Sequence, residues 1–431
     1  MNIPVSKKPR VVIVGGGFAG VALAKELVER KNFQIVLLDR QNYHTFQPLL
    51  YQVSTSSLEP DSIAYPLRKI VKRGKNTFFR MAEVEKIDPD HKKVYTNIGA
   101  INYDYLVIAT GAKTNFFGNK TIEKNAMRMK SLPQALNLRS LMLENLEQAV
   151  ITGDDKEQKE LMNFVIAGAG PTGVELAGGI AELKANVLPR DYPDMNFDNM
   201  EIHLIEGGSR VLPPMSETAS KNAEKFLKNL GVTIHLNTQV TDYKDFEVTT
   251  NTDLTLKTHT LIWSAGVTGA PINGLKAESL IERANRYNVD NFNRVIGYND
   301  VFAIGDIALM KAAGYDKGHP MVAQPAIQQG KHLAKNLLLL SKGKPMKNFE
   351  YFDKGSMATI GRNKAVVDIG KLRFGGFFAW FIWMFIHLLF LVGFRNKLIT
   401  LFNWVYNYIN FDKASRLIVR PFKADEVIDS V

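Results

Sequence analysis

The chain of 431 residues contains no cysteine. Disulfide exchange, thiol nucleophiles, iron–sulfur clusters and cysteine-ligated zinc all require that side chain, so each of these chemistries is excluded. The absence does not identify a redox compartment, because a chain without thiols survives in any of them. Acidic side chains are in short supply, with 43 Asp and Glu against 54 Lys and Arg and a formal net charge of +11. This excess favours an anionic partner, which composition leaves open as nucleic acid, acidic lipid or a phosphate-rich ligand.

The N-terminus lacks the apolar core of a signal peptide and leaves no room for a transit peptide before the first strand-like run. We therefore expect synthesis as a cytosolic chain. The length predicts two or three domains of about 150 residues each. An apolar content of 45% is that of a globular protein with an ample core.

A pattern of strand, glycine turn, helix and strand occurs twice. The first copy begins with the β-branched run Arg10–Val14 and ends with a strand predicted at 34–38. The second begins with a strand at Phe164–Ala167, continues through a helix pattern at 174–185 and ends with a strand at 201–205. Two copies of this unit in one chain predict two nucleotide-binding domains.

The first turn reads Gly15-Gly16-Gly17-Phe18-Ala19-Gly20, which matches the spacing G-x-G-x-x-G between a strand and a helix. In this motif Gly15 permits the tight turn, Gly17 lets the backbone approach a pyrophosphate, and Gly20 allows close helix–strand packing. The helix N-terminus supplies amide donors to the phosphates. Asp39 closes the second strand, where an acid bonds ribose hydroxyls.

The second turn reads Gly168-Ala169-Gly170-Pro171-Thr172-Gly173, and its acid is Glu206. This acid lies later than usual because the helix and the following loop are longer. An acid here favours NAD over NADP, since a 2′-phosphate would meet a like charge. Arg210 lies nearby and can soften that preference. We expect NADH to be preferred.

Two dinucleotide sites suggest a nicotinamide that donates hydride and a flavin that relays the electrons. Together with Ala109-Thr110-Gly111 and Ala303-Ile304-Gly305-Asp306, the two turns resemble the two-dinucleotide-binding-domain flavoproteins. The resemblance implies an α/β, glutathione-reductase-like fold of two Rossmann-like domains. FAD would occupy the first site, with Asp306 bonding its ribityl or phosphate region, and the nicotinamide nucleotide the second. Within this superfamily the missing cysteines exclude disulfide reductases and sulfide:quinone reductases.

Three further stretches resemble the type II NADH dehydrogenases, which are single-subunit NADH:quinone oxidoreductases. They are residues 42–52, residues 323–330, and residues 394–397 with Asn403 and Trp404. The likeness spans nearly the whole chain, with one departure at Ser56, where the family often has glycine. It implies FAD and NADH as cofactors, a membrane quinone (ubiquinone or menaquinone) as acceptor, and a homodimer on the cytoplasmic face of a bacterial membrane. Nucleic acid and metal ions are not expected, and without a bundle of polar transmembrane helices neither is proton pumping.

Two glutamines in the 323–330 stretch are candidate catalytic residues. Pro325 suits a first helical turn, so Gln324 is expected near a helix N-terminus that would stabilise negative charge on a reduced flavin. Gln328 is four residues further along and is expected on the same helix face, able to reach a quinone carbonyl. The alternative is that both glutamines merely cap and solvate the helix.

Glu175 follows Gly173 by two residues, and we expect it in the first turn of the second nucleotide helix. Acids are common there because the helix dipole favours them. The family resemblance makes Glu175 the best candidate for a proton-handling carboxylate near nicotinamide and quinone. His44 is either a loop histidine with satisfied hydrogen bonds or a flavin contact.

Residues 374–394 form a run without Asp, Glu, Lys or Arg. This run is long enough to span a bilayer. A spanning helix, a buried core helix and a helix in the membrane surface compete, with Gly375-Gly376 interrupting the start and His387 in the middle. The basic flanks and the family resemblance favour surface anchoring, on anionic lipid. The next stretch is amphipathic, with Leu398, Leu401, Phe402, Val405, Tyr408 and Ile409 on one face and Asn403, Asn407 and Asn410 opposite.

We divide the chain into an FAD-binding domain (1–115 and 286–370), an NADH-binding domain (116–285) and a membrane-anchoring segment (371–431). The candidate catalytic residues are Glu175, Gln324 and Gln328. The candidate FAD contacts are Gly15, Gly17, Phe18, Ala19, Gly20, Asp39, Arg40, His44, Val84, Ala109, Thr110, Gly111, Gly305, Asp306, Ala323 and Gln324. The candidate NADH contacts are Gly168, Gly170, Pro171, Thr172, Gly173, Glu175, Glu206, Ala265 and Gly266.

Overall fold

A computed structural model describes residues 1–410, 415–418 and 422. The chain forms two compact units. The first comprises Met1–Thr45, Tyr65–Lys113 and Val267–Asp353, and the second Phe46–Ala64, Thr114–Gly266 and Lys354–Val431. Each unit contains one of the two glycine turns. Residues 46–64 and the C-terminal segment belong to the second unit, whereas our sequence division kept the former with the FAD-binding domain and the latter apart.

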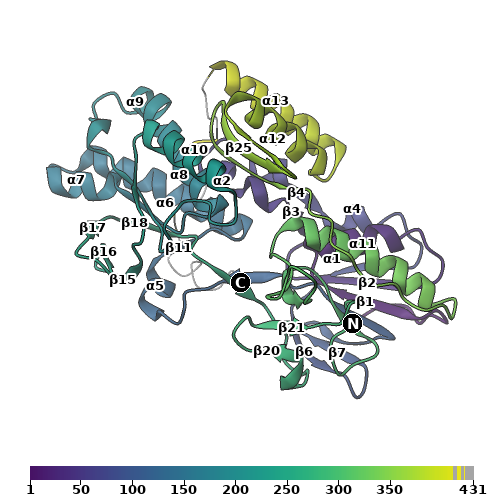
Figure 1. Ribbon diagram of the computed structural model, residues 1–431. Helices are drawn as coiled ribbons and strands as arrows, with labels where there is room; N and C mark the ends of the chain where they lie inside the picture. Colours follow the sequence, from purple (N-terminus) through teal and green to yellow (C-terminus); the bar gives the residue numbers. More distant parts are fainter. Residues whose placement is uncertain (411–414, 419–421, 423–431) are drawn as a thin grey trace. The chain divides into compact units, whose positions relative to one another are not determined.

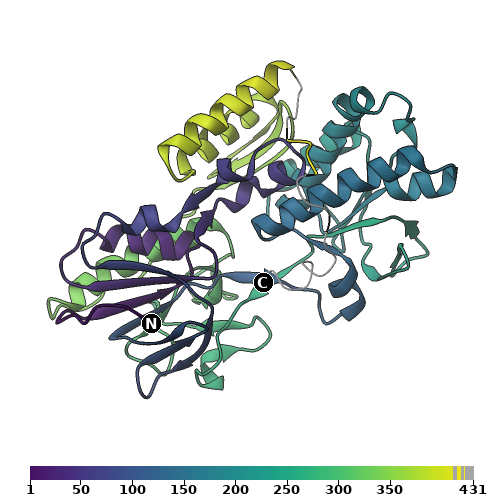
Figure 2. The ribbon, with the colours of Figure 1, turned by 180° about the vertical axis from the view of Figure 1, so that it is seen from behind.

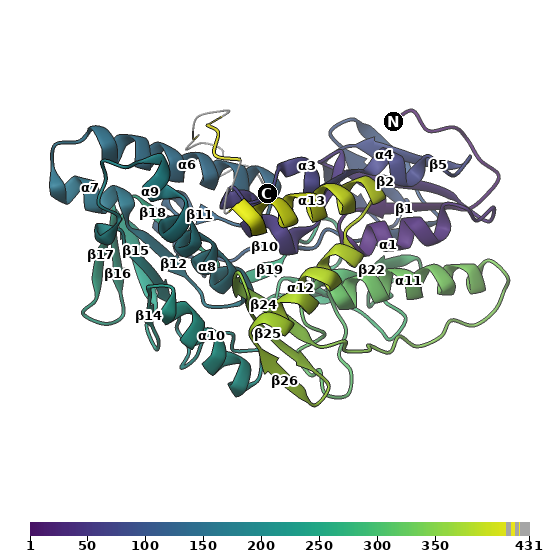
Figure 3. The same cartoon turned by 90° about the horizontal axis from the view of Figure 1, so that it is seen from above.

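The first unit is built on a five-stranded parallel sheet in the order β22-β9-β1-β2-β5. The strands are β1 (Arg10–Val14), β2 (Gln34–Asp39), β5 (Thr77–Met81), β9 (Tyr105–Ile108) and β22 (Val301–Ala303). Helices α1 (Phe18–Leu27) and α11 (Ala323–Leu340) lie side by side in Figures 1 and 3.

Side chains that alternate along β1 serve opposite faces of this sheet, as expected for a pleated strand. Val11 and Ile13 pack with α1 and α11 residues such as Leu333. Val12 and Val14 pack instead toward the antiparallel strands β6 (Val84–Asp88), β7 (Lys93–Thr96) and β8 (Gly99–Asn102). The sheet is therefore buried on both faces, which is why its strands read as unbroken apolar runs.

The second unit repeats the arrangement with a parallel sheet in the order β11-β18-β12-β13-β14. Helices α6 (Leu132–Ile151), α8 (Pro171–Asn186) and α10 (Glu217–Asn229) accompany it (Figures 1 and 2). A capping box fixes the start of α6, since Ser131 accepts from the Gln134 backbone while the Gln134 side chain accepts from the Ser131 amide. The strands are β11 (Met127–Arg128), β12 (Phe164–Ala167), β13 (Ile202–Ile205), β14 (Val232–His235) and β18 (Thr260–Trp263).

The C-terminal segment adds three antiparallel strands and two helices to the second unit. The strands are β24 (Ser356–Gly361), β25 (Lys364–Ile369) and β26 (Leu372–Gly375), and the helices are α12 (Phe377–Phe390) and α13 (Phe394–Asn410). The uncharged run 374–394 is thus not one helix, because it begins in β26 and breaks again at Gly393, which has a φ of 92°. With 14 residues, α12 is about 21 Å long, short of a hydrocarbon core of about 30 Å. Within the described residues no helix is long and apolar enough to cross a membrane, so the spanning alternative was wrong.

Helix α13 is amphipathic as predicted, but polar side chains hold it to the protein. Asn396 Nδ2 donates to the backbone carbonyls of Asp61, Ser62 and Ala64 at 2.9, 3.1 and 2.8 Å. Trp404 Nε1 donates to Gln52 Oε1 at 2.8 Å, and Asn407 Nδ2 donates to the Ser57 carbonyl at 3.0 Å. The outward residues are apolar, and Phe402 and Ile409 expose 71% and 70% of their surface.

Contact between α8 and β24 depends on a glycine. A Cβ built on Gly178 would lie 1.8 Å from the carbonyl oxygen of Ile360, so only a residue without a side chain lets the strand approach the helix so closely. This approach brings Thr359 of β24 next to the carboxyl of Glu175 on α8.

We predict that Gly178→Ala destabilises the protein by about 1–3 kcal/mol, because the added methyl group must push two backbones apart. The melting temperature of the purified holoprotein measures this effect. Gly153→Ala is the matched control, because a Cβ at Gly153 meets no described atom within 4 Å. Equal melting temperatures for the two variants would contradict the close approach.

Candidate active site

The first glycine turn leaves the start of α1 open for an anion. Gly15 has a φ of 110°, and a Cβ there would lie 2.2 Å from the Ala109 carbonyl oxygen. A Cβ on Gly20 would lie 1.9 Å from the Gly15 carbonyl oxygen, which explains the close packing of helix on turn. Gly17 is the N-cap residue and makes no side-chain cap, and a Cβ there meets no described atom within 4 Å. The amides of this helix terminus therefore fit a pyrophosphate.

Asp39 is anchored beside this turn by both of its carboxylate oxygens. Oδ2 accepts from the Gly16 amide at 2.5 Å, and Oδ1 accepts from the Gln41 amide at 2.7 Å. Burial raises the pKa of this carboxyl, and the two amides oppose the rise by stabilising the charged form. Each oxygen keeps a further lone pair with which to accept from a ribose hydroxyl.

The second turn repeats this construction. Gly168 has a φ of 98° and Gly170 is the N-cap of α8, again with open space where a Cβ would stand. Glu206 Oε2 accepts from the Ala169 amide and Oε1 from the Gly208 amide, both at 2.8 Å. Glu206 is separated from its glycine turn by more residues than Asp39 is, but it holds the equivalent position. The second turn also fits a dinucleotide.

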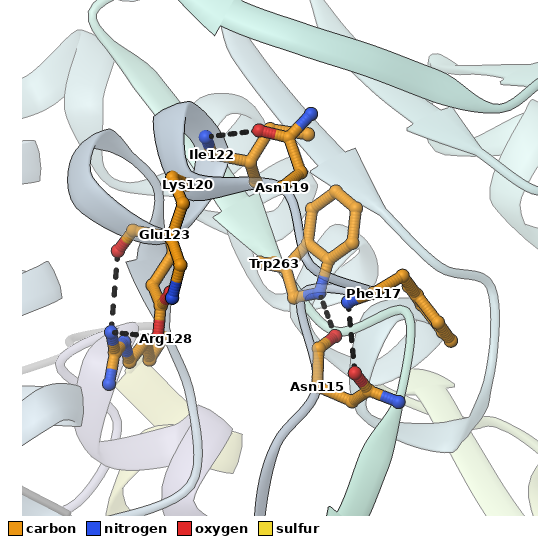
Figure 4. Close-up of polar contacts among 8 residues, drawn as sticks. All are labelled: Asn115, Phe117, Asn119, Lys120, Ile122, Glu123, Arg128 and Trp263. Atoms are coloured by element: carbon orange, nitrogen blue, oxygen red, sulfur yellow. Dashed lines mark hydrogen bonds and ion pairs between the residues drawn. The ribbon is translucent and has the colours of Figure 1, made fainter. Parts of the chain in front are cut away.

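The strand end behind the second turn is shown in Figure 4. Trp263 Nε1 donates to the Asn115 carbonyl at 2.8 Å, and the Asn115 amide donates to the Gly266 carbonyl at 3.1 Å. These bonds hold residues 264–266 against the turn, where a Cβ on Gly168 would lie 2.6 Å from the Ala265 Cα. The predicted NADH contacts Ala265 and Gly266 therefore adjoin the glycine turn.

His44 is buried in the first unit. Its Nδ1 lies 3.0 Å from the Gly16 carbonyl, and its ring meets Phe18 edge to face at a centroid distance of 5.1 Å. Nε2 has no hydrogen-bond partner in the described chain. Burial lowers the pKa of this imidazole to about 4, so it is neutral near pH 7. Its contacts with the turn and with Phe18 are compatible with a flavin contact, which stays a prediction.

The remaining candidate residues for FAD and NADH differ in their positions and contacts. Arg40 pairs with Glu83 at 3.6 Å on the surface, and Val84 begins β6. Thr110 Oγ1 donates to the Ala270 carbonyl at 2.7 Å. Gly305 and Asp306 form a short 3-10 turn, and Ala323 begins α11. Phe18 and Ala19 form the start of α1, and Pro171 and Thr172 that of α8.

The glutamines of α11 differ in their contacts with the rest of the chain. Gln324 does lie in the first turn of the helix. Gln328, however, donates to the Phe352 carbonyl at 2.9 Å and accepts from the Phe352 amide at 3.0 Å, so its amide is engaged with the chain itself. Gln329, which sequence reasoning missed, is fully buried and accepts from the Gly305 amide at 2.7 Å. Gln328 and Gln329 are neighbours in the sequence, so only the direction in which each side chain leaves the helix decides which of them is buried.

Glu175 lies in the second turn of α8, not the first, because the motif residues from Pro171 onward already form the first turn. Its carboxyl is buried, and burial raises its pKa well above the ordinary value, opposed by the Thr359 amide and the Trp383 indole. The Trp383 N–H is close enough to act electrostatically, but it makes no hydrogen bond of ordinary geometry within the described chain.

A cavity of about 120 Å³ in the second unit has Glu175 in its wall. Aromatic side chains from α2 (Leu50–Ser54), α12 and α13 contribute to it, among them Tyr51, Trp383 and Trp404. None of these neighbours is near Glu175 in sequence. Among the described residues no cluster of His, Cys, Asp and Glu suits a metal ion.

Comparison with known proteins now adds to this geometry. Residues 9–330 match the family model of pyridine nucleotide-disulphide oxidoreductases, and residues 354–410 match the NDH2 C-terminal domain. The type II NADH:quinone oxidoreductase Ndh of Mycobacterium tuberculosis is 36% identical over 418 residues, covering 94% of this chain and 89% of that protein. The chain belongs to the type II NADH:quinone oxidoreductases. The type II NADH:quinone oxidoreductase of Haemophilus influenzae is 30% identical over 397 residues, covering 85% of this chain and 88% of that protein.

Solved structures agree with the fold of this type II enzyme. NDH2 from Plasmodium falciparum, solved in complex with NADH, superposes with a TM-score of 0.88 at 21% identity, covering 96% of this chain and 100% of that chain. A sulfide:quinone oxidoreductase from Aquifex aeolicus reaches 0.71 at 19% identity, covering 90% and 92%. The predicted α/β fold of two dinucleotide-binding domains is therefore confirmed, as is the recognised family.

We predict that His44 makes stability depend on pH. The folded chain keeps this imidazole neutral down to about pH 4, whereas the unfolded chain protonates it near 6.5. Its contribution is therefore present above pH 6.5 and is lost as pH falls toward 4. Relative to His44→Asn, the wild type should lose about 1–2 kcal/mol between pH 7 and pH 5. Thermal unfolding of both proteins at the two pH values measures this, and a constant difference would contradict the prediction.

Proposed function

We propose that this type II NADH:quinone oxidoreductase holds FAD at its first glycine turn and NADH at its second, and that Glu175 supplies a proton to the quinone at a membrane surface. The enzyme oxidises NADH and reduces a quinone, as its family membership shows. The observation that carries the residue assignments is the repeated turn, with Asp39 and Glu206 held by equivalent amides.

Bound FAD supplies a carrier that takes hydride from NADH and passes two electrons to the quinone. The chain's part is to bind and orient. The N-termini of α1 and α8 face the phosphates, while Asp39 and Glu206 accept from ribose hydroxyls. Gln324, in the first turn of α11, lies at the helix end where a dipole favours negative charge. Gln328, whose amide bonds the backbone of Phe352, keeps a second N–H that can donate to a quinone carbonyl.

The proton balance of the reaction requires a proton donor, and we assign this role to Glu175. The hydride of NADH carries two electrons and one proton, whereas a hydroquinone holds two electrons and two protons more than the quinone, so each turnover takes one proton from solvent. Burial keeps the Glu175 carboxyl protonated in a pH range where an exposed glutamate is charged. A neutral acid beside the C-terminal helices is suited to donate to a substrate that arrives from the membrane.

We predict that Glu175→Gln slows reoxidation of the reduced enzyme by quinone about a hundredfold, the effect of losing a general acid. Hydride transfer from NADH needs no added proton and should keep its rate. Stopped-flow absorbance at the flavin band separates the two half-reactions, and the flavin content of the purified variant controls for folding. Unchanged quinone reduction would remove Glu175 from the mechanism.

The exposed apolar side chains of α12 and α13 support attachment to one membrane face. Phe378, Phe381 and Phe385 expose 75%, 59% and 55% of their surface, and Phe394 exposes 76%. So many exposed aromatic residues on neighbouring helices mark an interaction surface. Exposed basic residues of the same C-terminal segment, such as Lys371, favour anionic lipid. The cytoplasmic side of a bacterial membrane and a homodimer are further parts of this proposal, and both rest on family resemblance.

We predict that Phe381→Asp with Phe385→Asp releases the enzyme from vesicles containing phosphatidylglycerol, because each change removes apolar contact and adds like charge. Flotation through a density gradient measures the bound fraction. Ile151→Asp is the control, since Ile151 is 74% exposed but lies at the end of α6, outside the C-terminal helices. Equal binding of the double variant and the control would disprove attachment by this surface.

A further inference from the structure

The wall of the cavity beside Glu175 contains both buried and partly exposed residues. Tyr51, Thr55 and Thr359 are buried together with Glu175. Among the members that retain partial exposure, which we call the partly exposed end of the cavity, are Ser57, Glu182, Asn186, Arg362, Asn407 and Tyr408. Both kinds of residue come from the second unit, so the cavity is defined within one compact body.

The lining of this cavity is mainly apolar, but polar side chains in its wall offer hydrogen bonds to water molecules. A water molecule occupies about 30 Å³ in the liquid and needs polar partners to enter a protein. The volume of about 120 Å³ leaves room for a short chain of molecules, and hydroxyl, amide and carboxyl groups in the wall offer them hydrogen bonds. A cavity lined only by apolar groups would stay dry.

Glu182 is the second carboxylate in the wall and lies two helical turns after Glu175 on α8. The Arg362 amide donates to Glu182 Oε1, which fixes the carboxylate at the turn between β24 and β25. The Arg362 guanidinium lies 3.8 Å from the centre of the Tyr408 ring. Glu182 and Arg362 both belong to the partly exposed end, where protons can exchange with bulk water.

Tyr51 lines the same cavity as the two carboxylates. Burial raises the pKa of its phenol well above the usual value, so the hydroxyl keeps its proton. The phenolic oxygen accepts from Gln52 Nε2 at 2.8 Å, which orients the hydroxyl while leaving its own proton to be donated. A phenol that both accepts and donates can pass a proton along a chain of waters.

We propose that this cavity is the proton-uptake route of the enzyme, with Glu182 as its outer acid and Tyr51 as an intermediate that returns a proton to Glu175 after each turnover. This inference rests on the proposed role of Glu175. Glu175 gives its proton to a quinone oxygen and is left charged, Tyr51 and the waters pass one proton inward, and Glu182 takes one from solvent. Each turnover then consumes one solvent proton, which matches the stoichiometry of the reaction.

The test uses Glu182→Gln, which keeps the shape of the side chain and its acceptor for the Arg362 amide but removes the ionisable group. Reoxidation of the reduced holoenzyme by quinone should slow about threefold to tenfold, with a larger deficit at higher pH where solvent protons are scarce. The titratable and charged groups in the cavity wall are Tyr51 of α2, Glu175 and Glu182 of α8, Arg362 of the hairpin and Tyr408 of α13. His387 of α12 lies behind the wall and stacks on Trp383.

Three readouts separate this role from a structural one. Reduction of the flavin by NADH should keep its rate, the solvent deuterium isotope effect on reoxidation should rise, and a small weak acid such as formate should restore the rate. Glu217→Gln makes the same chemical change on an exposed acid of α10, with 78% of its side chain accessible, and should alter none of these. If Glu182→Gln reoxidises at the wild-type rate across pH, the route is wrong.

A second variant covers the case in which Glu182→Gln fails to fold. Ser57→Met adds apolar volume at the partly exposed end, so it should expel water and slow reoxidation without removing a charge. Wild-type reoxidation in a folded Ser57→Met enzyme would overturn the route. The comparison with Glu175→Gln keeps the two proposals distinct. If Glu175→Gln is slow and both of these variants are fast, the proton donor stands and the route fails.

Discussion

Hydrogen bonds from polar side chains of α13 to residues 52–64 hold this helix against the protein, and the cavity beside Glu175 depends on them. Asn396 satisfies three backbone carbonyls in residues 61–64, and Trp404 and Asn407 bond residues 52 and 57. Because the polar face of α13 is turned toward the protein, its apolar side chains point outward. The same set of hydrogen bonds therefore places Trp404 and Asn407 in the wall of the Glu175 cavity and leaves the apolar side chains of α13 exposed.

The burial of Glu175 follows from this docking. α12 and α13 bring Trp383 and Trp404 to the cavity, β24 brings Thr359, and the absence of a side chain at Gly178 lets β24 approach α8. A carboxyl enclosed by aromatic rings holds its proton at a pH where a solvent-exposed one has lost it. The proposed membrane attachment and the proposed proton chemistry would thus both follow from one packing arrangement.

The two nucleotide turns show how local geometry can be conserved within a chain while spacing changes. Asp39 and Glu206 have side chains of different length and follow helices of different length. Each nevertheless accepts from the amide of the second residue of its glycine turn and from the amide two residues after itself. The strand-to-helix crossing requires an acceptor at that point, and either acid supplies it. This explains why the late position of Glu206 did not mislead the sequence interpretation.

The sequence by itself determined what depends on neighbours along the chain: the strands beside each glycine turn, the turns, the start of α1, the polarity pattern of α13 and the exclusion of thiol chemistry. It placed Glu175 one helical turn too early, because the glycine motif conceals the first turn of α8. Only the tertiary structure decided which backbone groups Gln328 and Gln329 of α11 bond and which face of α13 meets the protein. It alone also brought Tyr51, Glu182 and Trp383 to one cavity, because contacts between residues far apart in the chain arise from packing and leave no local pattern.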